Sequence, residues 1–131
     1  MRRIVMQLTI IVVFLSCAST DEPFMATLSS SDREAAIKEQ FHQAASEALR
    51  ETGAVLDREA ADELRLVWQM AARRLVEDDA SPVDVGRAVA NVRRIVIAAA
   101  GRTPVGGVTR EITFRNLENA RYSLCPLYPF C

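Results

Sequence analysis

Residues 81–101 read SPVDVGRAVANVRRIVIAAAG, and this stretch decides the fold class. Ser81 is a typical helix N-cap, and Asp84 completes an acidic variant of the capping box. Pro82 occupies the first helical position, where its missing N–H costs no hydrogen bond. Gly101 ends the pattern. Between these signals, apolar residues recur at helical spacing and predict one buried face: Val85, Val89, Val92, Ile95, Val96 and Ala99.

The same helix carries two small residues, Gly86 and Ala90. We expect these two positions to permit close approach of another helix. Arg87, Asn91 and Arg94 mark the side that we expect to face solvent.

Two further helices are predicted before this one. A capping box from Ser31 to Glu34 starts the first, and Gly53 supplies its C-terminal stop. The second starts at Asp57 and ends near Asp78, where the helix dipole disfavours negative charge. The residues expected to be buried in these two helices are Ile37, Phe41, Ala44, Ala45, Ala48, Leu49, Leu64, Val67, Trp68, Ala71 and Leu75.

The C-terminal part begins with residues 108–114, which read VTREITF and alternate apolar with polar side chains, as a strand does. This strand could lie extended across the helices, or pair with another strand of this chain or of a second chain. Residues 116–124 predict a short helix. The fold class is therefore mainly α: a small three-helix bundle (residues 31–101), then an extended C-terminal segment and a terminal disulfide loop (residues 102–131).

The N-terminus has the layout of a secretory signal peptide. Arg2 and Arg3 precede an apolar run from Ile4 to Leu15, about twelve residues, and small residues follow. A membrane-spanning helix needs about 20 residues, so residues 1–16 predict a signal peptide rather than a permanent anchor. Residues 17–30 have mixed polarity and no period, and predict a flexible tether.

Residues 14–17, Phe-Leu-Ser-Cys, resemble the lipobox of bacterial lipoproteins. The resemblance implies that Cys17 is lipidated and becomes the mature N-terminus. Phe14 departs from the pattern, because Leu is usual at that position. The alternative is ordinary signal-peptide cleavage after Ala18 or Thr20, with Cys17 removed. The lipobox implies the periplasmic face of the outer membrane, and the alternative implies a periplasmic or secreted protein.

Three cysteines are present, and Cys125 and Cys131 remain once Cys17 is lipidated or removed. An oxidising compartment would pair them. A zinc site needs more ligands, and the single histidine, His42, is distant in sequence. A catalytic redox pair usually has the spacing C-x-x-C. The spacing therefore predicts a structural disulfide.

The disulfide loop, residues 125–131, also carries Leu127, Tyr128 and Phe130. These three side chains either pack back onto the helices or form a contact surface for a partner. Trp68 has a similar pair of interpretations: a core residue, or the wall of a cavity for an apolar ligand.

No sequence motif indicates catalysis. His42 is the only possible histidine base, and the phosphate-binding and dinucleotide-binding glycine motifs are absent. Without Arg2 and Arg3, fourteen basic and seventeen acidic residues remain, a formal charge of −3. The net charge is therefore negative, whereas nucleic-acid-binding proteins carry an excess of basic residues. We therefore expect no catalytic residue, cofactor, metal or nucleic acid.

The resulting functional prediction is an exported, lipid-anchored helical protein of the bacterial cell envelope. It would act without catalysis, as an accessory factor that binds another envelope protein. The alternatives are a helical carrier of an apolar ligand or lipid, and a soluble periplasmic or secreted protein of another role.

Overall fold

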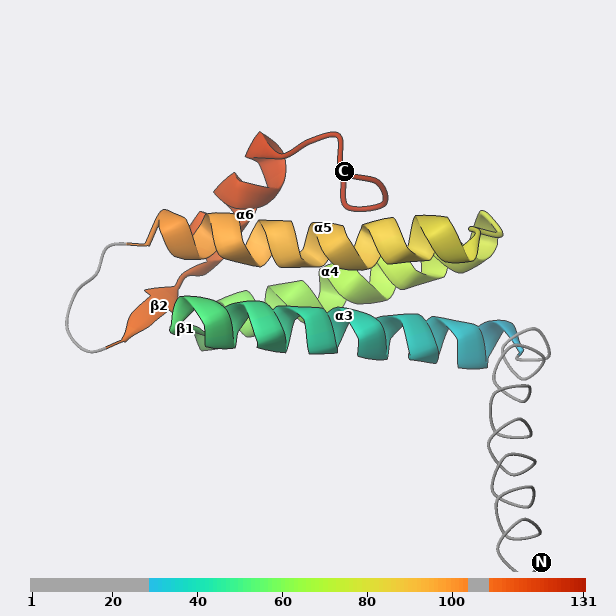
Figure 1. Cartoon of the computed structure of the whole chain (residues 1–131), viewed down its shortest axis with the longest axis horizontal. Helices are drawn as coiled ribbons and strands as arrows, with labels where there is room; N and C mark the ends of the chain where they lie inside the picture. Colours follow the sequence, from blue (N-terminus) through green and yellow to red (C-terminus); the bar gives the residue numbers. More distant parts are fainter. Residues whose placement is uncertain (1–28, 104–108) are drawn as a thin grey trace, which may run out of the picture. The chain divides into compact units, whose positions relative to one another are not determined.

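The computed structural model describes residues 29–103 and 109–131. Within these ranges the protein is mainly helical, which confirms the predicted fold class. Figure 1 shows three long helices side by side, with a shorter helix and the C-terminal loop lying against them. The helices are α3 (Ser30–Thr52), α4 (Arg58–Glu77), α5 (Pro82–Gly101) and α6 (Phe114–Ser123).

The start of α3 differs from the sequence prediction. The hydroxyl of Ser29, not of Ser31, accepts a hydrogen bond from the backbone N–H of Asp32 at 3.2 Å. Ser29 also donates to the Asp32 carboxylate at 2.8 Å. The predicted capping box between Ser31 and Glu34 is therefore wrong, because the first serine of the run pairs with an acidic residue at the same spacing. Glu34 instead lies 4.0 Å from the guanidinium of Arg73.

The starts of α4 and α5 agree with the sequence prediction. The side chain of Asp57 accepts a hydrogen bond from the N–H of Ala60, and that of Ser81 accepts one from the N–H of Asp84. Pro82 occupies the first turn of α5. Each cap satisfies a backbone donor that the helix itself leaves free.

The predicted strand pairs with a segment that the sequence analysis did not recognise. β1 (Ala54–Leu56) and β2 (Arg110–Ile112) form a parallel two-stranded sheet in which Val55 lies opposite Glu111. β1 occupies the three residues between Gly53, whose φ is +64°, and the N-cap of α4. A segment this short shows no alternation. Of the arrangements that the sequence left open for the predicted strand, the structure shows pairing with another strand of this chain.

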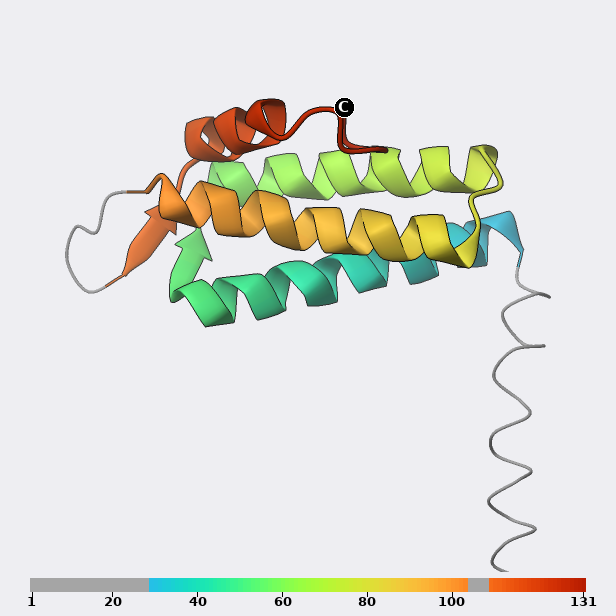
Figure 2. The same cartoon turned by 45° about the horizontal axis from the view of Figure 1, so that its top comes forward.

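The C-terminal segment belongs to the same compact unit as most of the long helices, residues 34–131. Helix α6 contacts both α4 and α5, and Figure 2 shows it lying along them. Leu117 and Ala120 of α6 are buried, as is Ile112 of β2. Residues 109–131 therefore complete the core.

The prediction for Gly86 and Ala90 is wrong within this fold. Both residues are exposed, and no atom lies within 4 Å of a Cβ placed at Gly86. The opposite face of α5 packs against the core through other residues, which are Ala88, Val92, Ile95, Val96, Ala99 and Ala100. The buried face of α5 is set by its apolar side chains at helical spacing. A single glycine has no side chain to bury and does not change which face packs inward.

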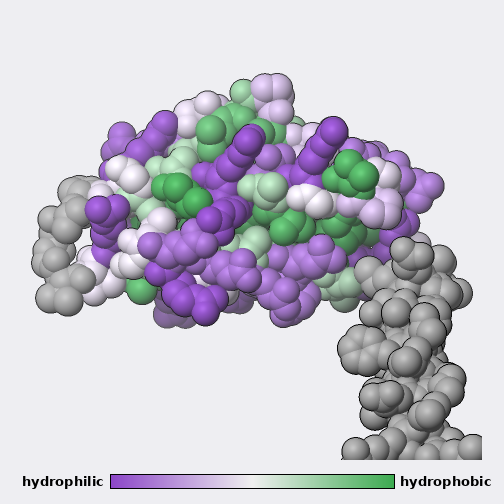
Figure 3. Space-filling model, viewed as in Figure 1, coloured by the Kyte–Doolittle hydropathy of each residue, from purple (hydrophilic) through white to green (hydrophobic). Residues whose placement is uncertain are grey.

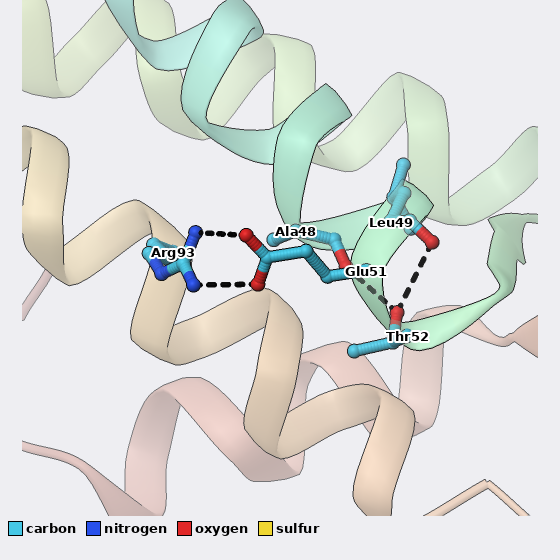
Figure 4. A network of polar contacts seen from close by, with 5 residues as sticks. All are labelled: Ala48, Leu49, Glu51, Thr52 and Arg93. Atoms are coloured by element: carbon cyan, nitrogen blue, oxygen red, sulfur yellow. Dashed lines mark hydrogen bonds and ion pairs between the residues drawn. The ribbon is translucent and has the colours of Figure 1, made fainter.

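A surface ion pair links the end of α3 to α5 (Figure 4). The two carboxylate oxygens of Glu51 accept hydrogen bonds from the guanidinium of Arg93, at 2.8 and 2.5 Å. These hydrogen bonds lower the pKa of Glu51 below its usual value. Next to it, the Thr52 hydroxyl donates to backbone oxygens of the last turn of α3, which closes that helix end.

The predicted signal peptide, Cys17 and nearly all of the predicted tether lie outside the described residues. Among the helices that the structure describes, none combines the length and the apolar character that crossing a bilayer requires.

Candidate functional site

The predicted disulfide is present. Cys125 and Cys131 are bonded, with 5.9 Å between their Cα atoms, and they close the loop that follows α6. The side-chain amide of Asn91 on α5 donates to the backbone oxygen of Tyr128 at 3.2 Å. Arg74 on α4 donates to the backbone oxygen of Cys131 at 3.4 Å. The disulfide loop is thus attached to two helices by polar contacts.

Two of the three large side chains of the disulfide loop pack onto the helices. Phe130 is 5% exposed, and its ring centroid lies 5.5 Å from that of Phe41 on α3. Leu127 is half-buried against the same core. Of the two interpretations that the sequence left open, the geometry favours packing onto the core for Leu127 and Phe130.

Tyr128 lies on the outer side of the loop, with 39% of its surface exposed. Its hydroxyl donates a hydrogen bond to the carboxylate of Asp78, and the guanidinium of Arg74 lies 5.2 Å from its ring centroid. The hydrogen bond to Asp78, then partial burial, then the negative charge of Asp78 raise the pKa of Tyr128. Tyr128 is therefore held in one position while part of its ring stays accessible.

An open groove of about 600 Å³ runs between α4 and the disulfide loop. Apolar side chains, including Val67, Ala71 and Phe130, contribute to its lining. We call it the loop groove, and its remaining lining residues are Met70, Arg73, Arg74, Glu77, Asp78, Arg121, Pro129 and Cys131.

Met70 is the most exposed apolar residue at the loop groove, with 72% of its surface accessible. Leu66, one turn earlier on α4, is 58% exposed. Sequence reasoning missed both residues, because it asked only which apolar positions fell on the buried face. Their position on the opposite face of α4 was the available signal.

Trp68 is a core residue, 5% exposed. The exposed His42 approaches it edge-on, with 4.8 Å between ring centroids and an interplanar angle of 89°. Trp68 borders an open pocket of about 370 Å³ that is lined mainly by polar and charged residues of α3 and α4. A smaller cavity, between Trp68 and Phe130, has a volume of about 10 Å³. That space holds no more than one water molecule, so it offers no room for an apolar ligand in this conformation.

Acidic, histidine and cysteine side chains do not gather into a group of three or more that could hold a metal ion, within residues 29–103 and 109–131. The loop groove instead combines an apolar surface with the accessible side chain of Met70 and three arginines. Tyr128 lies beside the groove, with its ring against Arg74. That combination is suited to binding a protein segment.

Comparison with known proteins identifies no relative of this chain. No protein-family model matches the chain, and neither the curated proteins nor the solved structures give a significant match. The loop groove and the disulfide loop are therefore the features that indicate a function.

Proposed function

We propose that this chain is an exported, lipid-anchored helical protein of the bacterial cell envelope that acts by binding another protein, without catalysis. The observation that carries the proposal is the disulfide loop, held against α4 and α5 beside an open groove. Disulfides persist in oxidising compartments outside the cytosol. The signal-peptide layout and the lipobox at Cys17 agree with that location.

The loop groove has the chemistry of a protein-binding surface. Tyrosine and arginine are enriched among the residues that dominate interface energies, and Tyr128 and Arg74 lie together at this site. Met70 supplies a flexible apolar side chain that adapts to the shape of a partner. Because the disulfide and the Asp78 hydrogen bond already fix Tyr128, little conformational entropy remains to be lost on binding.

The first experiment tests the membrane anchor. Cys17→Ser should abolish the added mass of the diacylglycerol group and release the protein from the membrane fraction, since several acyl chains hold a protein firmly. Intact mass spectrometry and cell fractionation measure both effects. A mature N-terminus at Ser19 or Asp21 would contradict lipidation.

The second experiment tests the binding site. Met70→Glu places a charge on the apolar edge of the loop groove, at a residue too exposed to disturb the core. Gln69→Glu is the matched control, because Gln69 is exposed on the neighbouring side of α4 and does not line this groove. Affinity capture from membranes of the native host, quantified by mass spectrometry, should lose the partner with Met70→Glu alone.

The same purified protein distinguishes the carrier alternative. Native mass spectrometry and lipid extraction should find no stoichiometric non-covalent lipid in the protein, because the cavity between Trp68 and Phe130 has a volume of only about 10 Å³. Co-purification of one lipid per chain, with no partner captured, would replace the proposed function by that of a carrier.

A further inference from the structure

Helix α5 carries apolar side chains on its exposed side as well as on its buried side. Val83 and Ile97 are 64% and 39% exposed, and Ala90 lies midway between them, seven residues from each. Residues seven apart lie along one face of a helix. We call these three residues, together with Gly86, the α5 outer face. Figure 3 looks onto this helix and shows apolar side chains (green) among hydrophilic ones (purple) along it.

Two arginines, also seven residues apart, lie along one side of this stripe. Arg87 and Arg94 are exposed, and neither side chain has an ion pair or a hydrogen bond to any residue that the structure describes. The neighbouring Arg93 differs, because Glu51 of α3 holds it (Figure 4). The acidic residue of α5, Asp84, lies in the first turn of the helix. Its carboxylate accepts a hydrogen bond from the Ser81 hydroxyl and does not pair with either arginine.

From this arrangement we propose that the α5 outer face binds an amphipathic helix of a partner protein, whose apolar seam is flanked by acidic side chains. A seven-residue apolar repeat is the spacing with which two helices pack along each other. The open space above Gly86 and the small side chain of Ala90 let the backbones approach closely. Charged residues beside such a seam select the partner, and here the two arginines without an acidic partner, Arg87 and Arg94, line one side of it.

A second copy of this chain does not satisfy the same surface. An antiparallel pair centred on Ala90 would place Val83 opposite Ile97 of the copy, which suits both. It would also place Arg87 near Arg94 of the copy, twice, and like charges at an interface oppose binding. In a parallel pair Arg87 would face Pro82 of the copy and Arg94 would face Val89, so neither arginine would gain an acidic partner. An acidic helix from a different chain avoids both conflicts.

The α5 outer face is separate from the loop groove, which has no α5 residue in its lining. The inference therefore goes beyond the proposed function and can fail independently of it. If both surfaces bind, the protein would bridge two partner segments.

The test uses the purified full chain and a displayed library of helical peptides about as long as α5, which has 20 residues. We expect enrichment of peptides with an apolar seven-residue repeat flanked by Asp or Glu. Fluorescence anisotropy of the selected peptides then gives their dissociation constants. The double variant Arg87→Glu/Arg94→Glu should weaken binding by about tenfold or more, and should prefer peptides in which the acidic residues are replaced by lysine.

The matched control is Arg58→Glu/Arg65→Glu, which reverses two exposed arginines with the same spacing on α4. It should leave the dissociation constants unchanged, as should Met70→Glu. A second variant, Ala90→Arg, blocks the seam at an exposed position and should abolish binding while circular dichroism stays unchanged.

Several results would overturn the inference. One is a library in which no helical peptide is enriched, and another is a set of enriched peptides that bind the Arg87→Glu/Arg94→Glu variant equally well. A third is a dimer of this chain, detected by sedimentation, that Ala90→Arg abolishes. Binding of phosphatidylglycerol vesicles that depends on Arg87 and Arg94, without peptide binding, would assign the face to a membrane surface instead.

Discussion

The disulfide loop and the α5 outer face both place large apolar side chains beside arginines, yet only the loop has its apolar residues covered. Phe130 is 5% exposed and Val83 is 64% exposed. The loop follows a turn after α6, so the chain can fold it back onto the core, whereas α5 already uses its other face in that core. Apolar character therefore predicts burial only where the chain supplies a segment to cover the side chain.

The largest expected difference between the two regions is in stability. Phe130→Ala should destabilise the protein by about 3 kcal/mol, because it removes a buried ring and leaves a cavity against Phe41. Val83→Ala should cost less than about 0.5 kcal/mol, as exposed substitutions usually do. Urea denaturation followed by circular dichroism measures both. A similar loss in the two variants would show that Phe130 does not belong to the core.

Two isoleucines of α5 sharpen the comparison within one helix. Ile95 is 4% exposed and Ile97 is 39% exposed. Ile95→Ala should cost about 2–4 kcal/mol of unfolding free energy through lost burial and a cavity, and Ile97→Ala should cost far less. In the peptide-binding assay with folded protein, Ile97→Ala should weaken binding more than Ile95→Ala does, because only Ile97 belongs to the proposed α5 outer face. Equal destabilisation would mean that the two sides of α5 are wrongly assigned.

Much of the fold followed from local signals in the sequence. The caps at Asp57 and Ser81, the stop at Gly53 and the buried faces of the long helices all depend on residues a few positions apart. β1 could not be predicted, because three residues show no periodicity and its partner, β2, lies more than fifty residues away in the sequence. Ser29 was missed because three consecutive serines offer equivalent caps.

The candidate site was predictable only in part. The pairing of Cys125 with Cys131 followed from the number of cysteines and the compartment expected from the sequence. The burial of Phe130, in contrast, depends on a contact with Phe41, far away in the chain. The ring of Tyr128 meets Arg74 and Asp78 for the same reason. Contacts of this kind arise from the packing of α6 on α4 and α5, which no local pattern encodes.

Removing the disulfide should have a smaller effect than removing Phe130. Cys125→Ser with Cys131→Ser should cost about 2 kcal/mol, the chain-entropy value for so short a loop. Thermal unfolding with and without a dithiol reductant measures the change. Deleting residues 125–131 should lower the melting temperature further, because it also removes Phe130 from the core. Free thiols at both positions in protein isolated from the periplasm would contradict the disulfide.

The smallest expected effect concerns the hydroxyl of Tyr128, the polar counterpart of Phe130 in the same loop. Its pKa is raised, because the hydrogen bond to the Asp78 carboxylate favours the protonated hydroxyl in the folded protein. A raised pKa stabilises the fold at pH values below the ordinary tyrosine pKa of 10.0, and this contribution is lost as the pH rises through the folded value. Stability should therefore fall above about pH 10, and Tyr128→Phe should remove that part of the pH dependence while costing less than about 1 kcal/mol at neutral pH.

Ultraviolet titration in a Tyr122→Phe background isolates Tyr128, because the chain has two tyrosines. Asp78→Asn should lower the pKa of Tyr128 toward its ordinary value, since it removes the carboxylate that accepts the proton's hydrogen bond. Glu77→Gln is the matched control, because Glu77 lies next to Asp78 but does not bond to the hydroxyl. A Tyr128 pKa that is unchanged by Asp78→Asn would mean that the loop does not hold the ring against α4. The attachment of the disulfide loop would then depend on Leu127, Phe130 and the hydrogen bonds that Asn91 and Arg74 donate to its backbone.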